Sequence, residues 1–249
     1  SSLPQLNDLT DSNIVFKGKV SVLFVDMRKS TDLTDNIKSK KMVKVYRSYI
    51  RLVIQAIRYS GGYSRQFAGD GILGVFQDDN EEQENDRTSS TKAITAARYI
   101  HTLVNYVLNP QLKKKMDITI SCGVGVCTGI IMIAKAGMRG NEAKEDAENE
   151  LGIVWVGKTT NYASRYCSLA NPDEIFIDAT TYNEAQESGW NEATKVKVDM
   201  AFSGYVKEKY YLSFSDPDFN GEPVEDECEN SNSVPFVQTV FDCMNENAA

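Results

Sequence analysis

The amino-acid sequence predicts an α/β fold of the α+β kind. Two observations support it. Short runs of alternating or continuous apolar residues predict strands, and longer segments with an apolar residue every three or four positions predict helices. Their order along the chain is strand, helix, two strands, helix, strand. This is the order of a ferredoxin-like βαββαβ core, here followed by extra strands.

The chain has 249 residues and a formal net charge of −8. No segment is long and apolar enough to cross a bilayer, and the opening SSLPQLNDLTD lacks the basic start and apolar stretch of a signal peptide. We therefore expect a cytoplasmic protein that binds no membrane. The negative charge argues against nucleic-acid binding, which usually requires a basic face. The five cysteines form no CxxC pair, so a structural zinc site or disulfide framework is not expected.

We divide the chain into an N-terminal arm (1–16), a folded domain (17–215) and an acidic C-terminal tail (216–249). In the first half of the domain, an apolar strand is predicted from Lys19 to Met27. A helix is predicted from Lys38 to Tyr59, and Ser60-Gly61-Gly62 ends it. Two short strands then flank Ala68-Gly69-Asp70-Gly71, whose two glycines favour a hairpin turn.

The second half begins with a helix predicted from Thr91 to Leu108, on which His101, the only histidine, is predicted to be exposed or half-buried. Residues 136–150 form a polar insert that we expect to be mobile. The remaining strands are predicted at Asp117 to Cys127 and Ile130 to Ala134, which turn at Thr128-Gly129, then at Leu151 to Val156, Glu174 to Asp178 and Lys195 to Phe214.

Two aspartates end neighbouring strand patterns: Asp26 in KVSVLFVDMRKST and Asp70 in YSRQFAGDGILGVF. Two carboxylates brought together repel each other unless a cation lies between them. With the backbone carbonyl of Met27 they supply hard oxygen ligands, which suit Mg²⁺ or Mn²⁺ completed by phosphates and water. The structural alternative is that Asp26 caps a turn and Asp70 only occupies an Asp-Gly hairpin.

Two further groups suit phosphate chemistry. Arg28-Lys29-Ser30-Thr31 follows Asp26 directly and offers backbone N–H groups, hydroxyls and positive charge where a helical segment begins, which predicts a cradle for a triphosphate tail. Asn161 and Arg165 lie four residues apart in VGKTTNYASRY and so share one helix face. Alternatively, Asn161 caps its helix and Arg165 pairs with a surface acid.

Four motifs in register, FVDMRKST, FAGDGILGVF, GVGVCTG and VGKTTNYASR, resemble the class III nucleotidyl cyclase catalytic domain from about Lys19 to Phe214. The resemblance implies that fold and a head-to-tail homodimer with active sites at its interface. It implies two divalent ions on Asp26 and Asp70 of one subunit, and Asn161 and Arg165 from the other. The implied reaction is attack of the ribose 3′ oxygen on the α-phosphorus, with pyrophosphate leaving.

The sequence departs from the family in the base pocket. Gln66 stands where adenylyl cyclases carry a Lys, and Val154 or Trp155 stands where they carry an Asp or Thr; the Glu and Cys of guanylyl cyclases are also absent. A Gln amide matches N3–H and O4 of uracil, or N3 and the amino group of cytosine. A mismatched base costs about 1–3 kcal/mol per unpaired buried group. Trp155, Tyr46 or Tyr49 would narrow the pocket further against purines.

This pattern resembles the bacterial pyrimidine cyclases of anti-phage defence (the Pycsar type), which implies UTP or CTP as substrate, with UTP favoured, and a separate effector that reads the cyclic product. Three rivals stay open. The first is an adenylyl or guanylyl cyclase with an unusual pocket, and the second an inactive cyclase-like module that binds a nucleotide. The third, a GGDEF-like or palm-type enzyme, lacks its Gly-Gly-Asp-Glu-Phe signature and a basic template surface here.

Overall fold

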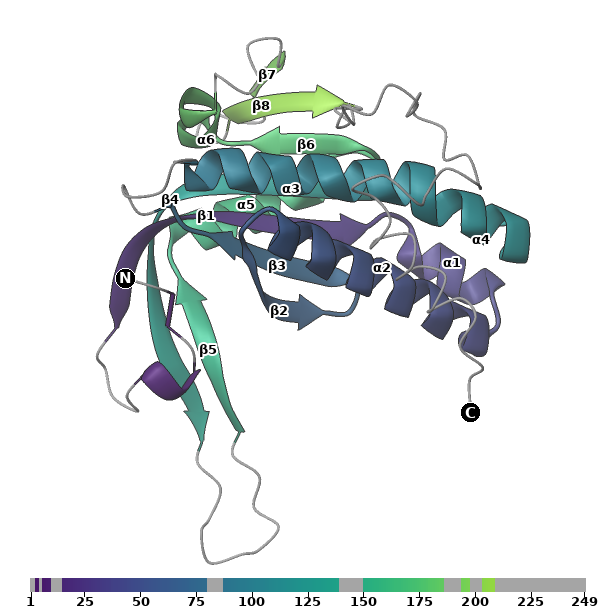
Figure 1. Cartoon of the computed structure of the whole chain (residues 1–249), viewed down its shortest axis with the longest axis horizontal. Helices are drawn as coiled ribbons and strands as arrows, with labels where there is room; N and C mark the ends of the chain where they lie inside the picture. Colours follow the sequence, from purple (N-terminus) through teal and green to yellow (C-terminus); the bar gives the residue numbers. More distant parts are fainter. Residues whose placement is uncertain are drawn as a thin grey trace, which may run out of the picture.

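A single mixed sheet organises the molecule (Figure 1). The structure is a computed structural model and describes residues 3–4, 6–9, 15–79, 87–138, 150–185, 194–197 and 203–208. The strands are β1 (Phe16–Met27), β2 (Tyr63–Ala68), β3 (Gly71–Phe76), β4 (Cys122–Met138), β5 (Glu150–Val156), β6 (Glu174–Ile177), β7 (Thr194–Lys197) and β8 (Ser203–Glu208). Their order in the sheet is β2-β3-β1-β4-β6-β8-β7, and β5 pairs with the far part of β4.

The helices connect these strands along the chain. They are η1 (Leu6–Asp8), α1 (Ser30–Asn36), α2 (Ser39–Tyr59), α3 (Ser89–Leu103), the π-helical η2 (Val104–Leu108), α4 (Asn109–Met116), α5 (Lys158–Leu169) and α6 (Ala179–Glu184). The run β1, α2, β2, β3, α3, β4 gives the neighbours β2-β3-β1-β4, all antiparallel. The predicted ferredoxin-like core with extra strands is therefore confirmed.

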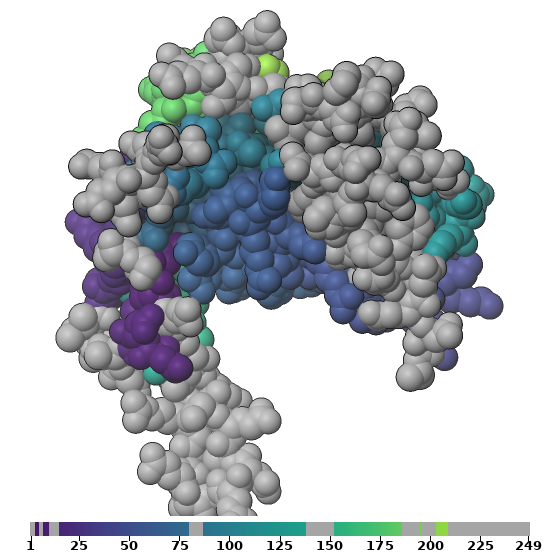
Figure 2. All heavy atoms as spheres, in the orientation of Figure 1, coloured from purple at the N-terminus to yellow at the C-terminus, as the bar shows by residue number. Residues whose placement is uncertain are grey.

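The sheet has a different covering on each face. Helices α2 and α3 pack on one face, and α5 packs on the other (Figure 1). Strand β1 serves both faces by alternation: Leu23, Val25 and Met27 join the core under α2 and α3, whereas Val20 and Val22 join the cluster under α5. In Figure 2 the blue atoms of α2 and the neighbouring β2 fill the middle of the face turned to the viewer.

Strand β4 corrects one prediction. A turn is predicted at Thr128-Gly129, but β4 runs without a break through both residues, which pair with Ser21 and Val20 of β1. The glycine here makes room for a neighbour, because a Cβ on Gly129 would lie 2.7 Å from Thr159 Oγ1. Thr128 is held in the strand by a buried polar cluster.

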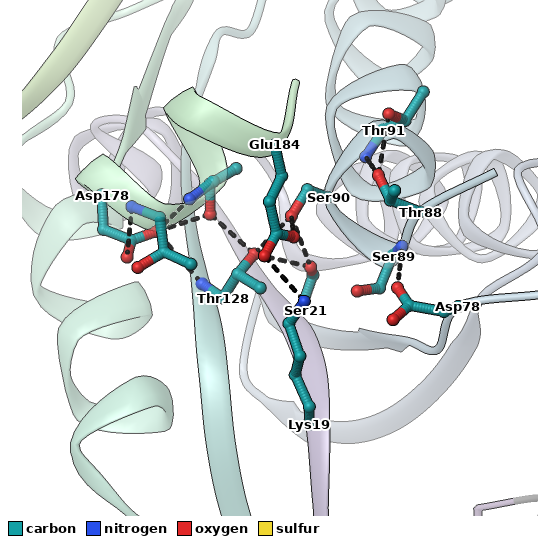
Figure 3. Close-up of polar contacts among 12 residues, drawn as sticks. Lys19, Ser21, Asp78, Thr88, Ser89, Ser90, Thr91, Thr128, Asp178 and Glu184 are labelled. Carbon is teal, nitrogen blue, oxygen red and sulfur yellow. Dashed lines mark hydrogen bonds and ion pairs between the residues drawn. The ribbon is translucent and has the colours of Figure 1, made fainter. Parts of the chain in front are cut away.

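The buried polar cluster consists of Ser21, Ser90, Thr128 and Thr181 and joins β1, α3, β4 and α6 (Figure 3). Thr128 Oγ1 lies 2.6 Å from Ser21 Oγ, 2.9 Å from Ser90 Oγ and 2.7 Å from Thr181 Oγ1. At its two ends Ser90 donates to Glu184 and Thr181 donates to Asp178. Because each hydroxyl has a partner, the cluster fixes these four elements at little cost in buried polarity.

The second predicted helix is only partly right. It divides into α3, one π-helical turn and α4, which continues past Pro110 to Met116. Pro110 lies in the first turn of α4, directly after the π-helical turn. The prediction for His101 is wrong: its side chain is completely buried, and burial and the charge of Arg28 lower the pKa of the imidazole to about 3.

Part of the N-terminal arm packs on the domain, where Leu3 and Leu9 join the cluster under α5. The insert prediction falls mostly on residues 139–149, outside the described residues, although β4 and β5 extend into both of its ends. Residues 209–214 of the last predicted strand and the whole acidic tail also lie outside them. Among the helices that the structure describes, none has the length and hydropathy needed to span a membrane.

Candidate active site

Asp26 and Asp70 lie beside each other at one end of the sheet. Asp26 is the second-last residue of β1, and Asp70 lies in the tight turn between β2 and β3. The β1–β3 register pairs Val25 with Ile72, so the next residues, Asp26 and Gly71, stand opposite each other. A Cβ on Gly71 would lie 3.5 Å from Asp26 Oδ1. The hairpin predicted from the two glycines is present, with Gly69 at φ +64°.

These two carboxylates have the character of an incomplete cation site. Burial, and then the negative charge of Asp70, raise the pKa of Asp26, although Arg28 opposes this. The buried Oδ2 of Asp70 has no hydrogen-bond partner among the described residues. Nor do those residues contain a group of three His, Cys, Asp or Glu side chains able to hold a metal ion. The pair therefore fits a divalent cation that takes its other ligands from backbone carbonyls, water or substrate.

The loop after Asp26 leads into the predicted phosphate cradle. Met27 is buried at the end of β1, Lys29 has the left-handed backbone (φ 56°), and α1 begins at Ser30, as predicted. Lys29 and Thr31 are exposed, and Ser30 is half-buried. A cavity of about 320 Å³ adjoins the loop and is lined by Arg28 and Lys29 together with residues of α1 and of 119–121.

Arg28 turns toward α5. Its Nε donates to the carbonyl of Ala170 at 3.1 Å, its Nη2 donates to the carbonyl of Cys167, and its Nη1 lies 3.4 Å from Asp26 Oδ2. A contact between Arg28 and a triphosphate stays a prediction. In the structure its guanidinium already bridges Asp26 and the C-terminal end of α5.

Asn161 and Arg165 lie one turn apart on the exposed face of α5. Ala163 and Cys167 occupy the opposite face and lie against Gly125 of β4, where a Cβ would come within 2.3 Å of the Ala163 carbonyl oxygen. The glycine thus lets α5 approach the sheet closely and leaves the Asn–Arg pair facing outward. Asn161 and Arg165 therefore share one exposed surface of α5, away from the buried side of the helix.

A β-bulge sets the direction of Gln66. The β2–β3 register shifts between Ser64 and Gln66, so that Gln66 stands opposite Leu73. Leu73 also pairs with Phe24 of β1, and both belong to the cluster on the α5 side. Gln66 is therefore placed on the same sheet face as Asp26, two residues beyond Phe24. Without the extra residue Gln66 would oppose Ile72 and belong to the other face.

Val154 and Trp155 divide between two environments. Trp155 is 8% exposed and packs in the cluster under α5, whereas Val154 is 42% exposed. Val154 is thus the one with a surface open to a ligand. Tyr49, predicted to narrow the pocket, is wholly buried in the core under α2 and α3.

Within one chain, Val154 lies far along the sheet from Asp26. Val154 pairs with Ala134 of β4, and Asp26 pairs with Gly123 of the same strand. Their two partners on β4 are 11 residues apart (134 − 123), which corresponds to a contour length of roughly 35 Å along the strand. Counted along β4, Val154 is therefore well separated from the aspartates of its own chain.

An exposed apolar strip extends beside Val154 on the β4–β5 arm. Met132 pairs with Val156 across the two strands, and Ile130 shares the face of Met132. The side chains of Ile130, Met132, Val154 and Val156 are 57%, 40%, 42% and 43% exposed. Four large apolar side chains in one exposed strip are typical of a protein–protein contact.

Comparison with known families matches the model of the adenylate and guanylate cyclase catalytic domain to residues 15–213. The chain belongs to this family. Among curated relatives, a uridylate cyclase from Gulbenkiania mobilis is 25% identical over 217 residues, covering 85% of this chain and 80% of the relative. Another uridylate cyclase, from Burkholderia cepacia, is 29% identical over 189 residues and covers 74% of each chain.

Solved cyclase structures share the fold. The guanylyl cyclase Cya2 has a TM-score of 0.64 at 20% identity and covers 82% of this chain and 96% of its own. The adenylyl cyclase CyaB from P. aeruginosa has a TM-score of 0.62 at 17% identity and covers 78% of this chain and 95% of its own. The predicted class III cyclase fold is therefore confirmed.

The sequence analysis of this cyclase missed two local features of the site: the bulge before Gln66 and the bridge made by Arg28. The bulge has no sequence signal, because its extra residue is Arg65 and not a glycine. The bridge had one. Gly123 and Gly125 in GVGVCTG are two apart and so share a strand face, which signals a close approach on that face.

Proposed function

We propose that this chain is a uridylate cyclase, which converts UTP to 3′,5′-cyclic UMP and pyrophosphate in a homodimer with two composite active sites. The observation that carries the reaction is the pair of adjacent carboxylates, Asp26 and Asp70, with an unpartnered buried oxygen. The substrate is supported by relatives named uridylate cyclase whose alignments cover 74–85% of this chain.

Cyclases of this class use divalent metal ions. Asp26, Asp70 and the Met27 carbonyl would hold two such ions, Mn²⁺ or Mg²⁺, which supply charge neutralisation at the phosphates and a lowered pKa for the attacking hydroxyl. Lys29, Ser30 and Thr31 bind the triphosphate tail through positive charge, hydroxyls and backbone N–H groups. Arg28 reaches the same tail only if it leaves its partners on α5.

Asn161 and Arg165 come from the other copy of the chain. Their exposed positions one turn apart allow both to face a nucleotide bound at the partner's aspartates. Asn161 orients the ribose, and Arg165 stabilises charge that develops on the α-phosphate during attack of the 3′ oxygen. The protein supplies alignment and charge, and no side chain attacks the phosphorus.

Gln66 and Val154 read the base. The Gln66 amide donates to O4 of uracil and accepts from N3–H. Val154 offers an apolar wall with no polar group for a purine amino group, and Trp155 supports it from within the core. The apolar strip on β4 and β5 continues from Val154 and supports a dimer contact next to the base.

The cyclic product acts as a messenger, and a separate effector reads it in anti-phage defence. This part of the proposal rests on resemblance to pyrimidine cyclases.

Purified protein incubated with Mn²⁺ and each of the four nucleoside triphosphates tests the proposed reaction. We expect cyclic UMP as the main product by mass spectrometry, with at least tenfold less cyclic CMP, AMP or GMP (about 1.4 kcal/mol of discrimination). Asp26→Ala should abolish the product while the far-UV circular dichroism is unchanged. Cyclic AMP or GMP as the main product would contradict the proposed substrate. Absence of any cyclic product would contradict the proposed reaction.

A further inference from the structure

We propose that Arg28 is a positioning residue, which holds the metal-binding end of β1 in fixed register with the C-terminal end of α5. This inference rests on the proposed function, because it assigns Arg28 to the alignment of Asp26 and of the helix that carries Asn161 and Arg165. It gives Arg28 a role through these elements and not through contact with the nucleotide.

The contacts of Arg28 span two elements that are far apart in sequence. The guanidinium donates to the carbonyls of Cys167 and Ala170, 139 and 142 residues away, and to Asp26, near the end of β1. Its backbone N–H is also fixed, since it donates to the carbonyl of Ser121 at 2.8 Å. The side chain is only 16% exposed. All three guanidinium nitrogens of Arg28 therefore have hydrogen-bond partners in a mostly buried setting, where hydrogen bonds are strongest.

The acceptors suit a cation. Cys167 and Ala170 lie in the last turn of α5 and at its C-terminal cap, where carbonyl groups lack the i+4 partners of the helix interior and carry the negative end of the helix dipole. The Cys167 carbonyl accepts only a 3.3 Å bond from the Ala170 N–H within the helix end. Arg28 places its charge there and so caps α5. The same charge faces the Asp26 carboxylate, so the guanidinium occupies one side of it and leaves Oδ1 toward Gly71 and the β2–β3 turn.

The sheet provides the space for this bridge. Gly123 of β4 pairs with Asp26, and a Cβ on Gly123 would lie 2.0 Å from Arg28 Nη2 and 2.6 Å from its Cζ. Any larger residue at 123 would thus occupy the position of the guanidinium. Cys167 Sγ also donates to the Gly123 carbonyl at 3.3 Å, which holds the same turn of α5 against the same residue.

In the proposed dimer, the α5 that Arg28 holds supplies Asn161 and Arg165 to one active site, while the Asp26 that it holds serves the other. Displacing the guanidinium should misplace groups in both sites. Misplacement by about 1 Å is enough to slow a reaction that depends on alignment by up to about 100-fold. The expected defect is in kcat, since Arg28 does not bind the triphosphate in this role.

Two variants remove the bridge in independent ways. Arg28→Met deletes the guanidinium, whereas Gly123→Ala keeps Arg28 and displaces its guanidinium with one methyl group. If Arg28→Met fails to fold, Gly123→Ala still decides, because the three atoms nearest to its methyl group all belong to the Arg28 guanidinium, the far end of a side chain. Arg28→Lys keeps a positive charge but places it on a single nitrogen, which cannot reach the three acceptors that the separate guanidinium nitrogens contact. Arg58→Met, an exposed position on α2, is the matched control.

We expect Arg28→Met and Gly123→Ala each to lower kcat at least about tenfold with KM changed less than about twofold. The double variant should be no slower than Arg28→Met alone, and Arg28→Lys should recover little. A rise in KM instead would show that Arg28 contacts substrate and overturn the proposal. Full recovery by Arg28→Lys, or additive effects in the double variant, would also overturn it.

A second readout does not depend on activity. Hydrogen exchange of the amides near the end of α5 (165–170) should be faster in Arg28→Met and Gly123→Ala and unchanged in Arg58→Met. Equal exchange in all the variants overturns the bridge even if the chain makes cyclic UMP. Faster exchange supports the bridge even if the chain makes another product, so failure of this inference and failure of the proposed function are distinguishable.

Discussion

At the scale of single residues, the site contains charge that the fold alone would not favour. Asp178 illustrates the opposite case: its carboxylate accepts hydrogen bonds from the backbone N–H groups of Thr128, Thr180 and Thr181. Asp26 instead faces Asp70, and burial and that second charge raise its pKa. An aspartate whose folded-state pKa is raised destabilises the folded state when it is ionised at neutral pH. Residues retained at such a cost commonly serve function.

Neutralising Asp26 should therefore stabilise the fold while it removes activity. In buffer without divalent metal at pH 7, we expect Asp26→Asn to have a Tm equal to or higher than that of the wild type. Cyclic nucleotide formation should be lost. Asp178→Asn is the control and should lower the Tm, because its four donors lose a charged acceptor. A Tm for Asp26→Asn well below that of the wild type would show that Asp26 is a structural residue.

His101 predicts a pH dependence of stability. The unfolded chain binds a proton on this imidazole as the pH falls through about 6.5, whereas the folded pKa is about 3. Below pH 6.5 the unfolded state thus binds more protons than the folded state, and the stability of the fold decreases as the pH is lowered. Between pH 7 and pH 5 the expected loss is about 2 kcal/mol. Urea unfolding at the two pH values measures it, and His101→Leu should lose less over the same interval. An equal loss in both proteins would contradict the assignment.

At the scale of elements, the position of α5 on β4 decides where Asn161 and Arg165 lie. Gly125 makes this possible, because a Cβ there would meet the Cys167 backbone nitrogen at 2.1 Å and the Ala163 carbonyl oxygen at 2.3 Å. These are backbone atoms of a helix and cannot move singly. The helix as a whole would have to shift.

Gly125→Ala should destabilise the fold by about 1–3 kcal/mol or more and lower kcat at least about tenfold. Urea unfolding and the cyclase assay measure the two effects. Gly152→Ala on β5 is the matched control, since its Cβ would meet nothing within 4 Å. Gly125→Ala with wild-type stability and turnover would contradict the close approach of α5.

Sequence patterns predicted the type of most core elements and failed where a local rule conflicted with tertiary contacts. The alternation of apolar residues predicted β1, and Gly69 with Gly71 predicted the β2–β3 hairpin. Thr128-Gly129 was interpreted as a turn, but Thr128 is held in β4 by buried hydroxyl partners. No local pattern reveals such partners, which come from β1, α3 and α6.

At the scale of the whole molecule, the sequence indicated candidate site residues more readily than the way in which the fold assembles them. Asp26 and Asp70 were expected to meet, and the strand register brings them together. Gln66 could not be assigned to a sheet face in advance, because that depends on a bulge. The separation of Val154 from Asp26 along β4 depends on the full length of that strand, which the sequence analysis had divided in two.

The apolar strip on β4 and β5 should hold two copies together. Met132→Glu introduces a charge into this strip, and we expect a monomer with unchanged far-UV circular dichroism and less than about one tenth of the wild-type activity. Sedimentation velocity measures the assembly. Val43→Glu, at another exposed apolar position on α2, should stay dimeric and active. A dimeric and active Met132→Glu would exclude the strip from the interface.

The most direct test of an active site shared between two copies mixes two inactive variants, Asp26→Ala and Arg165→Ala, in equal amounts and supplies UTP with Mn²⁺. If each active site takes its aspartates from one copy and its arginine from the other, half of the randomly paired dimers carry one complete site. We then expect cyclic UMP at about a quarter of the wild-type rate, although neither variant makes it alone. No cyclic UMP from the mixture, with dimers present, would contradict the shared active site.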